Sequence, residues 1–313
     1  DLVNYDPLCG MCFTYCPRTF LDMAAMESKL FGRTRKEDEP LGIYRKAVAA
    51  QAQPVLEAAQ DGGVATALLI EAMQSGMIDC AIVTGRDDEW RTETIIATSP
   101  EEIRSAAGTK YTIHNSVMAV KDALEMGYKK IGFVGTPCQI QGLRKVKLLD
   151  EPYQFGQDKI ALLVGLFCME NFDYDALMNG LVKGKFGLEP KDVARFEIKK
   201  GMFRVIDKAG GAHEVKIEET DPYTFPGCGP CFDFASELAD VSVGSVGSAD
   251  GWSTVLTRTD MGEKLYGDAL AAGLIAEKAV SEKGLALAKR LAAGKVERFL
   301  RKSEEMKVGG IIR

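Results

Sequence analysis

The stretch 131–168 most constrains how this chain can fold, because it holds two short apolar runs that each lead into a cysteine. The first run leads into Cys138 and the second into Cys168. The amphipathic stretch 140–149 between them predicts a helix, and two buried strands joined by a helix form a βαβ unit with parallel strands. Both cysteines are therefore expected at the carboxyl edge of one sheet, where open α/β sheets bind ligands.

A second pair of cysteines, in Cys228-Gly-Pro-Cys231, follows with enough chain to fold back to that edge. Four thiols in this pattern suggest a metal or iron–sulfur site. The same tetrapeptide occurs in thioredoxins, but a thiol–disulfide site needs a preceding strand and a cysteine at a helix start. Residues 223–227 contain a proline and a glycine that interrupt a strand. We favour a metal or cluster site over a thioredoxin-like one.

Composition narrows the class of protein. The 313 residues carry a net charge of −6 and eight cysteines, and no apolar run approaches the roughly 20 residues of a membrane helix. The charge argues against nucleic-acid binding. We expect a cytoplasmic protein without a transmembrane segment, peripheral to a membrane only through a partner. Clustered cysteines in such a chain favour metal binding over disulfides.

The N-terminal cysteines form a motif of their own. Cys9, Cys12 and Cys16, the last followed by Pro17, match the last three cysteines of the bacterial ferredoxin run, and Asp6 stands where the first belongs. A zinc knuckle is the alternative. Because the Cys-Pro cysteine of two-cluster ferredoxins serves the other cluster, the remaining ligand stays open between Asp6, solvent and an upstream cysteine.

Three loops have the composition of cofactor-binding segments. Asp61-Gly62-Gly63 precedes a predicted helix at 64–75, whose N–H groups could face a phosphate. The loop 107–112 combines glycine, lysine and hydroxyl side chains, and the loop 244–253 combines glycines and serines with Trp252 after a strand. An Asp cap followed by two turn glycines is an equally common interpretation of the first loop, and a surface turn is the more common interpretation of the second. The predicted strand pair 196–206 carries a basic turn that suits either solvent or an anionic substrate tail.

With these residues established, the chain resembles the beta-subunit family of coenzyme F420-reducing hydrogenases and F420-dependent dehydrogenases over about residues 60–274. The resemblance rests on several blocks in one order. They are Asp61-Gly-Gly, Gly108-Thr-Lys-Tyr-Thr112, Pro137-Cys138-Gln139, Cys168-Met-Glu-Asn-Phe172, Cys228-x-x-Cys231 and Gly244-Ser-Val-Gly-Ser-x-Asp-Gly-Trp-Ser253. The added N-terminal cysteines make the layout most similar to the F420-oxidising input subunit of a reduced-F420 dehydrogenase.

The resemblance implies an iron–sulfur flavoprotein that transfers hydride between coenzyme F420 and FAD and single electrons through 4Fe-4S clusters to a partner redox complex. Cys138, Cys168, Cys228 and Cys231 would hold the core cluster, and Cys9, Cys12 and Cys16 with Asp6 an N-terminal one. The loops 108–112 and 244–253 would line the flavin. The predicted cofactor-binding residues are Asp61, Gly62, Gly63, Gly108, Thr109, Lys110, Tyr111, Thr112, Gly135, Thr136, Pro137, Gln139, Asn171, Gly244, Ser245, Gly247, Ser248, Asp250, Gly251, Trp252 and Ser253.

We further predict that Lys110 supplies a positive charge near the flavin and that Glu170 makes a polar contact at the cluster or flavin, the two catalytic candidates. Lys199, Lys200 and Arg204 are the candidates for binding the anionic tail of F420. The electron partner is expected to be a hydrogenase, formate dehydrogenase, heterodisulfide reductase or membrane dehydrogenase complex.

The predicted fold is α/β, with a mixed sheet core that contains parallel βαβ units. Residues 1–40 form a ferredoxin-like segment with the charged linker 33–40, residues 41–275 the FAD, 4Fe-4S and F420 core, and residues 276–313 a C-terminal helical tail. Two alternatives remain open: a flavin and iron–sulfur reductase of the same family acting on another substrate, such as a ferredoxin-linked or chlorophyll-type reductase, and a non-enzymatic zinc-stabilised scaffold.

Overall fold

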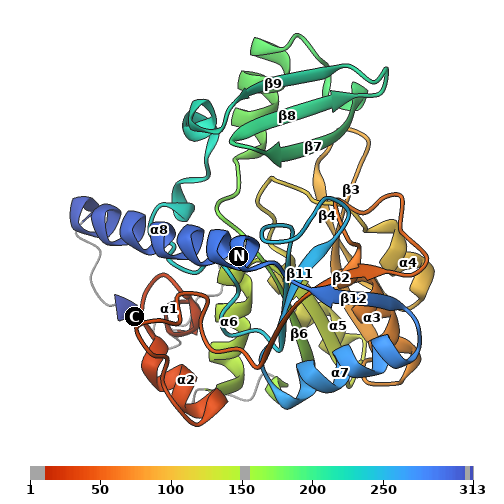
Figure 1. The fold of residues 1–313 in the computed structure, drawn as a ribbon, viewed down its shortest axis with the longest axis vertical. Coiled ribbons are helices and arrows are strands. Elements are labelled where there is room, and N and C mark those ends of the chain that lie inside the picture. The colour runs from red at the N-terminus through yellow and green to blue at the C-terminus, as the bar shows by residue number, and fades with distance from the viewer. Residues whose placement is uncertain (1–10, 149–155, 307–310, 313) are drawn as a thin grey trace.

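The fold is built on one eight-stranded mixed sheet (Figure 1). The computed structural model describes residues 11–148, 156–306 and 311–312. Four central strands, β10, β6, β5 and β3, run parallel, and the strands on both sides of them are antiparallel. This confirms the predicted mixed sheet. In spatial order the strands are β12 (Ile275–Ala279), β2 (Lys46–Ala52), β11 (Ser253–Thr257), β10 (Val241–Gly244), β6 (Ile160–Leu166), β5 (Ile131–Gly135), β3 (Cys80–Arg86) and β4 (Thr92–Ala97).

The predicted βαβ unit lies at the centre of this sheet. Strand β5, helix α6 (Pro137–Leu148) and strand β6 follow in order, and Gly135 at the end of β5 pairs in parallel register with Gly165 near the end of β6. Cys138 lies in the first turn of α6 and Cys168 comes two residues after β6. The expectation that both cysteines share the carboxyl edge of the sheet is therefore confirmed.

Helices cover both faces of the sheet because successive strand residues point to opposite sides. Leu162 packs into the core under α3 (Val64–Gln74) and α7 (Asp260–Ala271), and its neighbour Leu163 packs into the core under α2 (Met23–Phe31), α5 (Ala119–Glu125) and α6. The short helices α4 (Pro100–Ser105) and η2 (Ser116–Met118) pack at the β3–β4 side of these layers.

A small antiparallel sheet, the three-stranded sheet, lies beyond the carboxyl edge of the large one (Figure 1). It comprises β7 (Val193–Lys199), β8 (Met202–Asp207) and β9 (Ala212–Lys216), which confirms the predicted strand pair. Phe172, Phe196 and Phe203 form its core with the π-helix η4 (Ala176–Lys185). Short 3₁₀ turns connect these parts: η3 (Gln157–Lys159), η5 (Pro190–Asp192), η6 (Ile217–Tyr223) and η7 (Pro226–Cys228).

The two ends of the described chain lie side by side. Strand β1 (Leu21–Asp22), which follows α1 (Met11–Tyr15), pairs in parallel with β13 (Ile311–Ile312), and the long helix α8 (Glu282–Met306) runs beside this N-terminal region (Figure 1). No helix within the described ranges is both long and apolar enough to cross a membrane. The proposed division at residues 40 and 275 stays a prediction.

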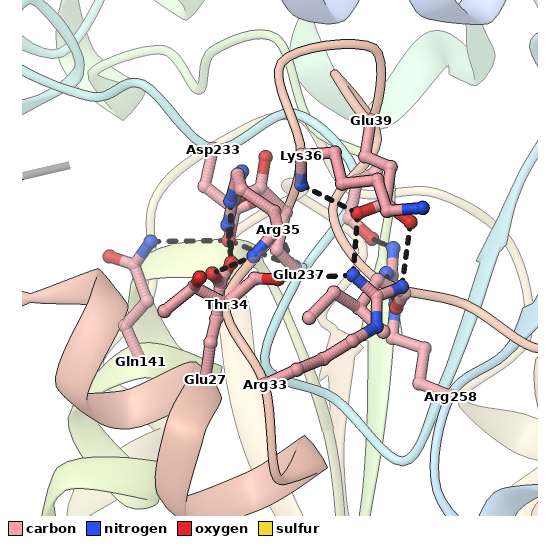
Figure 2. Close-up of polar contacts among 12 residues, drawn as sticks. Glu27, Arg33, Thr34, Arg35, Lys36, Glu39, Gln141, Asp233, Glu237 and Arg258 are labelled. Atoms are coloured by element: carbon pink, nitrogen blue, oxygen red, sulfur yellow. Dashed lines mark hydrogen bonds and ion pairs between the residues drawn. The ribbon is translucent and has the colours of Figure 1, made fainter.

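The charged segment 33–40 differs from the solvated linker that the sequence predicts. Arg35 places its guanidinium between two buried carboxylates, with Nε 2.5 Å from Oε1 of Glu27 and Nη2 2.5 Å from Oε2 of Glu237 (Figure 2). Arg33 pairs with Glu39 at 2.7 Å on the exposed side. A run of charges in the sequence cannot show that one member is buried, because the partner Glu237 lies some 200 residues away.

Candidate functional site

The four core cysteines meet at the carboxyl edge of the large sheet. Cys168 lies within electrostatic reach of the other three, Cys138, Cys228 and Cys231, although they come from separate segments of the chain. Burial is the main cause that raises the pKa of Cys138, Cys168 and Cys228, and the neighbouring thiols raise it further. Ligand thiols must lose their protons to bind metal, so loading of this site would release protons.

Hydrogen-bond donors surround the sulfur atoms. The backbone N–H of Asn171 donates to Sγ of Cys228 at 3.3 Å, and its side-chain amide donates to Sγ of Cys168 at 3.4 Å. The hydroxyl of Thr136 lies 3.3 Å from Sγ of Cys138. Such contacts tune the potential of a thiolate-held centre. Both Thr136 and Asn171 were predicted as cofactor-site residues, and the structure places them against the sulfurs.

The pair Cys228 and Cys231 does not have the geometry of a thioredoxin site. Cys228 ends the 3₁₀ turn η7, and the chain continues to Cys231 through a turn and an irregular segment. A thioredoxin-like thiol needs the N-terminus of a helix to stabilise its thiolate. The local backbone therefore supports the interpretation in which these thiols act as ligands.

A buried cation, Lys295, flanks the four thiols. Its Nζ donates to the backbone oxygens of Cys168 at 2.6 Å and Asp233 at 2.8 Å, and the residue is 1% exposed. Burial acts to lower its pKa, but Cys231, Cys168 and Asp233 outweigh this and raise it. Lys295 was not among the predicted residues, although its spacing gives a signal, because it falls on the buried face of α8 together with Ala288 and Ala292.

The donor set fits a thiolate-held centre. Among the described residues no group of three or more His, Cys, Asp or Glu side chains is arranged to hold a metal ion. The four thiols lie beside N–H donors and a buried cation. Thiolates are ligands of both zinc ions and iron–sulfur clusters, and this chemistry fits either group.

A buried polar network lies next to the thiol site. The carboxylate of Asp233 accepts from the side-chain amide of Gln141 at 3.1 Å and from the backbone N–H of Glu237 at 3.1 Å (Figure 2). Burial first, and then the charge of Glu237, raise the pKa of Asp233 to about 6. The guanidinium of Arg258, which is 0% exposed, donates to the backbone oxygens of Ile43 at 2.7 Å and Ala235 at 3.0 Å. This network fixes the segment that carries Cys231.

The first predicted cofactor loop, Asp61-Gly62-Gly63, packs against the end of the third, 244–253. The N–H of Gly62 donates to Oγ of Ser253 at 3.2 Å, and a Cβ on Gly62 would lie 2.6 Å from the backbone N of Ser253. This close approach explains the glycine. Burial is the main cause that raises the pKa of Asp61. The charge of Lys199 lowers this pKa, and the charge of Asp250 raises it.

The second loop, 107–112, connects the first loop to the thiols. Gly108 has a positive φ of 90°, and a Cβ there would lie 2.8 Å from the backbone oxygen of Ala58. The backbone oxygen of Tyr111 accepts from Phe172 at 2.8 Å, and Thr112 forms a bridge with Phe172. Burial and the charges of Asp61, Glu197 and Cys168 raise the pKa of Tyr111. The first two loops and the thiols therefore meet.

Lys110 turns inward within this loop. Its Nζ donates to the backbone oxygens of Ala106, Ala107 and Gly108 at 2.5, 3.1 and 3.0 Å. Burial, and then Arg86, lower the pKa of Lys110 to about 8. The ammonium group is thus engaged by carbonyl groups at the end of α4. Its role toward a flavin stays a prediction.

The third loop, 244–253, packs against α8 and contacts the three-stranded sheet. A Cβ on Gly284 would lie 1.9 Å from the backbone oxygen of Gly247, so the two backbones touch. Nζ of Lys278 lies 3.8 Å from the centroid of the Trp252 ring. Asp250 pairs with Lys199 of β7 at 3.4 Å.

The remaining predicted residues are placed as follows. Glu170 pairs with Arg298 of α8 at 2.5 Å. Gln139 accepts from the N–H of Thr136 and donates to Ser116 at 2.9 Å, which ties the start of α6 to its neighbours. The further cofactor residues Gly135, Pro137, Thr109, Ser245, Ser248 and Gly251 lie on the same strand ends and loops.

The three substrate-binding candidates lie on the three-stranded sheet. Lys199 ends β7, and the exposed Lys200, whose φ is +52°, lies in the turn between β7 and β8. Nε of Arg204 on β8 lies 2.9 Å from Oε2 of Glu214 on β9. Lys199 points to the loop of Asp250, while Arg204 is held by its own sheet.

Of the N-terminal cysteine motif, Asp6, Cys9 and the side chain of Cys12 lie outside the described part of the chain. Cys16 is described, and its sulfur accepts from the N–H of Arg18 at 3.4 Å. The buried Lys145 of α6 donates to the backbone oxygen of Cys16 at 3.1 Å, which fixes this segment to the core. Sequence reasoning did not identify Arg18 or Lys145.

Comparison with known proteins decides the family. The "Coenzyme F420 hydrogenase/dehydrogenase, beta subunit" family is described by two models, of which the N-terminal one matches residues 47–121 and the C-terminal one matches residues 128–283. The chain belongs to this beta-subunit family. The predicted resemblance is confirmed. Both models together span the large sheet, the three-stranded sheet and the four core cysteines.

Individual relatives agree with this assignment. The chain is 41% identical over 264 residues to coenzyme F420 hydrogenase subunit beta of Methanothermobacter thermautotrophicus, which covers 82% of this chain and 93% of that protein. It is 38% identical over 269 residues to coenzyme F420-dependent sulfite reductase of Methanocaldococcus jannaschii, covering 82% of this chain and 40% of that protein.

A solved structure confirms the architecture of this F420 family member. A chain of the F420-reducing NiFe hydrogenase complex from Methanosarcina barkeri matches with a TM-score of 0.82 and 39% identity, covering 87% of this chain and 95% of that one. The match confirms the large mixed sheet of the predicted fold.

Proposed function

We propose that this chain is the F420-dependent oxidoreductase subunit of a redox complex, in which it oxidises or reduces coenzyme F420 and exchanges electrons with partner subunits. The observation that carries the proposal is the meeting of four thiols and the flavin-loop candidates at one sheet edge, in a chain of this family. FAD would supply the hydride chemistry toward F420, and 4Fe-4S clusters the one-electron chemistry. The chain's own residues bind and orient these groups.

Cys138, Cys168, Cys228 and Cys231 would hold the core cluster. Asn171 donates to two of its sulfur ligands, and the hydroxyl of Thr136 lies in hydrogen-bond contact with a third. Lys295 fixes the backbone of Cys168 and compensates negative charge. An N-terminal cluster would use Cys9, Cys12 and Cys16 with Asp6. The buried Lys145 holds this second site against α6 through the backbone oxygen of Cys16.

The loops 61–63, 107–112 and 244–253 would hold FAD between the large sheet and the three-stranded sheet. The close backbone contacts at Gly62 and Gly108 support this assignment, because glycine lets a loop pass close to its neighbours. Lys110 would act by holding the carbonyl groups of its loop in one orientation, with its charge retained at neutral pH. Glu170 would act from the neighbouring thiol segment, oriented by Arg298.

Lys199, Lys200 and Arg204 would bind the anionic tail of F420. Replacing all three with alanine should raise the KM for F420 several-fold, while the rate at saturating F420 remains, because cations far from the reacting ring contribute binding energy alone. Lys208, which is exposed at the other end of β8, is the matched control, and its alanine variant should behave as wild type. An unchanged KM in the triple variant would refute the F420-tail assignment.

The partner would be a hydrogenase, formate dehydrogenase, heterodisulfide reductase or membrane dehydrogenase complex, with this chain on the cytoplasmic side. The N-terminal cysteine motif supports an arrangement in which F420 is oxidised at the core and the N-terminal region faces the partner. Division into a ferredoxin-like segment, a catalytic core and a C-terminal helical tail forms part of this proposal.

A further inference from the structure

One arginine contacts both cysteine sites. The backbone N–H of Arg18 donates to Sγ of Cys16 at 3.4 Å, and Nη2 of the same residue donates to Sγ of Cys231 at 3.7 Å. The two sulfurs are thus joined through a single residue and two hydrogen bonds, although Cys16 and Cys231 are more than 200 positions apart in sequence.

The guanidinium is held in place from two further directions. Nη1 donates to the backbone oxygen of Pro230 at 2.7 Å, and Nη2 donates to Oε1 of Gln141 at 3.2 Å. Gln141 is 0% exposed and is itself fixed by Asp233. Because both of these acceptors are uncharged, they orient the guanidinium without neutralising its positive charge.

Hydrogen bonds and positive charge at a ligand sulfur stabilise the reduced, more negative state of a thiolate-held centre, and so raise its reduction potential. Arg18 supplies both effects at Cys231, on the side that faces the N-terminal segment. Lys295 supplies a cation on the side that faces α8, through the backbone oxygens of Cys168 and Asp233. The core thiols therefore lie near two cations that are far apart in the sequence.

We propose that Arg18 is a positioning residue that holds the segment of Cys16 against the core thiols and raises the reduction potential of the core centre. This inference rests on the proposed function, since it concerns the centre that the four core thiols would hold. Arg18 lies outside the residues that match the family models, whereas the centre whose reduction potential it would raise lies inside them.

The test is a redox titration of purified wild type, Arg18→Gln and Arg18→Lys, monitored by electron paramagnetic resonance, with iron content measured in parallel. The core signal is the one that Cys138→Ala abolishes. Arg18→Gln keeps a polar side chain but loses the charge and the forked donors, and should lower the equilibrium constant for core reduction about tenfold, which is about 59 mV for one electron. Arg18→Lys should give a smaller shift.

Arg33→Gln is the matched control, because Arg33 lies in the same N-terminal region and pairs with Glu39 on the surface. Its core midpoint should equal that of wild type. Equal midpoints in wild type, Arg18→Gln and Arg18→Lys would overturn the inference while leaving the proposed function intact. Loss of iron from both Arg18 variants would also overturn it, by assigning Arg18 a purely structural role. A wild-type protein without iron would overturn both the inference and the proposed function.

Discussion

Replacing Arg35 with methionine tests how the N-terminal segment is held on the core. Arg35 lies between Glu27 and Glu237, whose side chains are 2% and 1% exposed, and its backbone N–H also donates to Glu27 at 2.9 Å (Figure 2). Methionine fills similar volume but leaves two buried carboxylates without the cation between them. Removing one partner of a buried ion pair costs about 3–5 kcal/mol.

That free energy determines the population in which segment 27–40 is detached from the core. At about 1.4 kcal/mol per factor of ten, the population in which segment 27–40 is detached should rise roughly 100-fold to a few thousand-fold. Native-state hydrogen exchange of the amides at 33–40, read by mass spectrometry, reports this population directly when reclosing is faster than exchange. The exchange rate of these amides should rise by the same factor.

Two variants make the test specific. Arg33→Met removes the neighbouring ion pair to Glu39, in which the arginine side chain is 42% exposed, and an exposed pair is worth at most about 1 kcal/mol, or about fivefold in exchange. Adding Glu27→Gln and Glu237→Gln to Arg35→Met should restore part of the protection, because the buried charges are gone. Equal exchange in the Arg33 and Arg35 variants would refute the reasoning.

Further predictions concern the cofactor loops and the thiols. Gly284→Ala should weaken FAD retention at least several-fold, because its Cβ would lie 1.9 Å from the backbone oxygen of Gly247 and displace that loop, whereas Gly294→Ala in the same helix meets nothing within 4 Å and should retain FAD. Flavin fluorescence after gel filtration measures both, and equal retention would contradict the loop assignment. Cys138→Ala should lose the core cluster iron by metal analysis, while the buried Cys80→Ala keeps it; retention of that iron in both would contradict the ligand assignment.

The centre of the fold was predictable because local pattern and a topological rule agree there. The apolar runs that become β5 and β6 leave few alternatives, and parallel pairing then places Cys138 and Cys168 together. The hairpin of β7 and β8 followed in the same way from alternation and a basic turn. The structure of these elements is determined by residues that are close to one another in sequence.

Other elements depend on distant neighbours. Strand β11 begins at Ser253, the last residue of the predicted loop, and it pairs with β2 on one side and β10 on the other. Five residues carry too weak a local preference to show this. Helix α7 begins at Asp260, where the side chain of Thr259 caps it.

The cations Lys295, Arg18 and Arg35 also differ in whether the sequence alone could identify them. Lys295 lies on the buried face of α8, so its helical spacing with apolar residues gave a usable signal. Arg18 and Arg35 gave none, because their partners Cys231 and Glu237 come from the far end of the sequence and only the folded chain brings them together. The predicted ligand thiols could be found from sequence, whereas the cations beside them required the structure.

The most direct test of the central claim is an anaerobic absorbance spectrum of the purified chain before and after addition of reduced coenzyme F420. The account predicts flavin and iron–sulfur absorption that bleaches on addition, with recovery of oxidised F420 absorbance in proportion to the electrons taken up. Flavin and cluster bands that stay unbleached would contradict the F420 assignment and favour a related reductase with another substrate. A colourless protein that contains zinc would contradict the redox function itself.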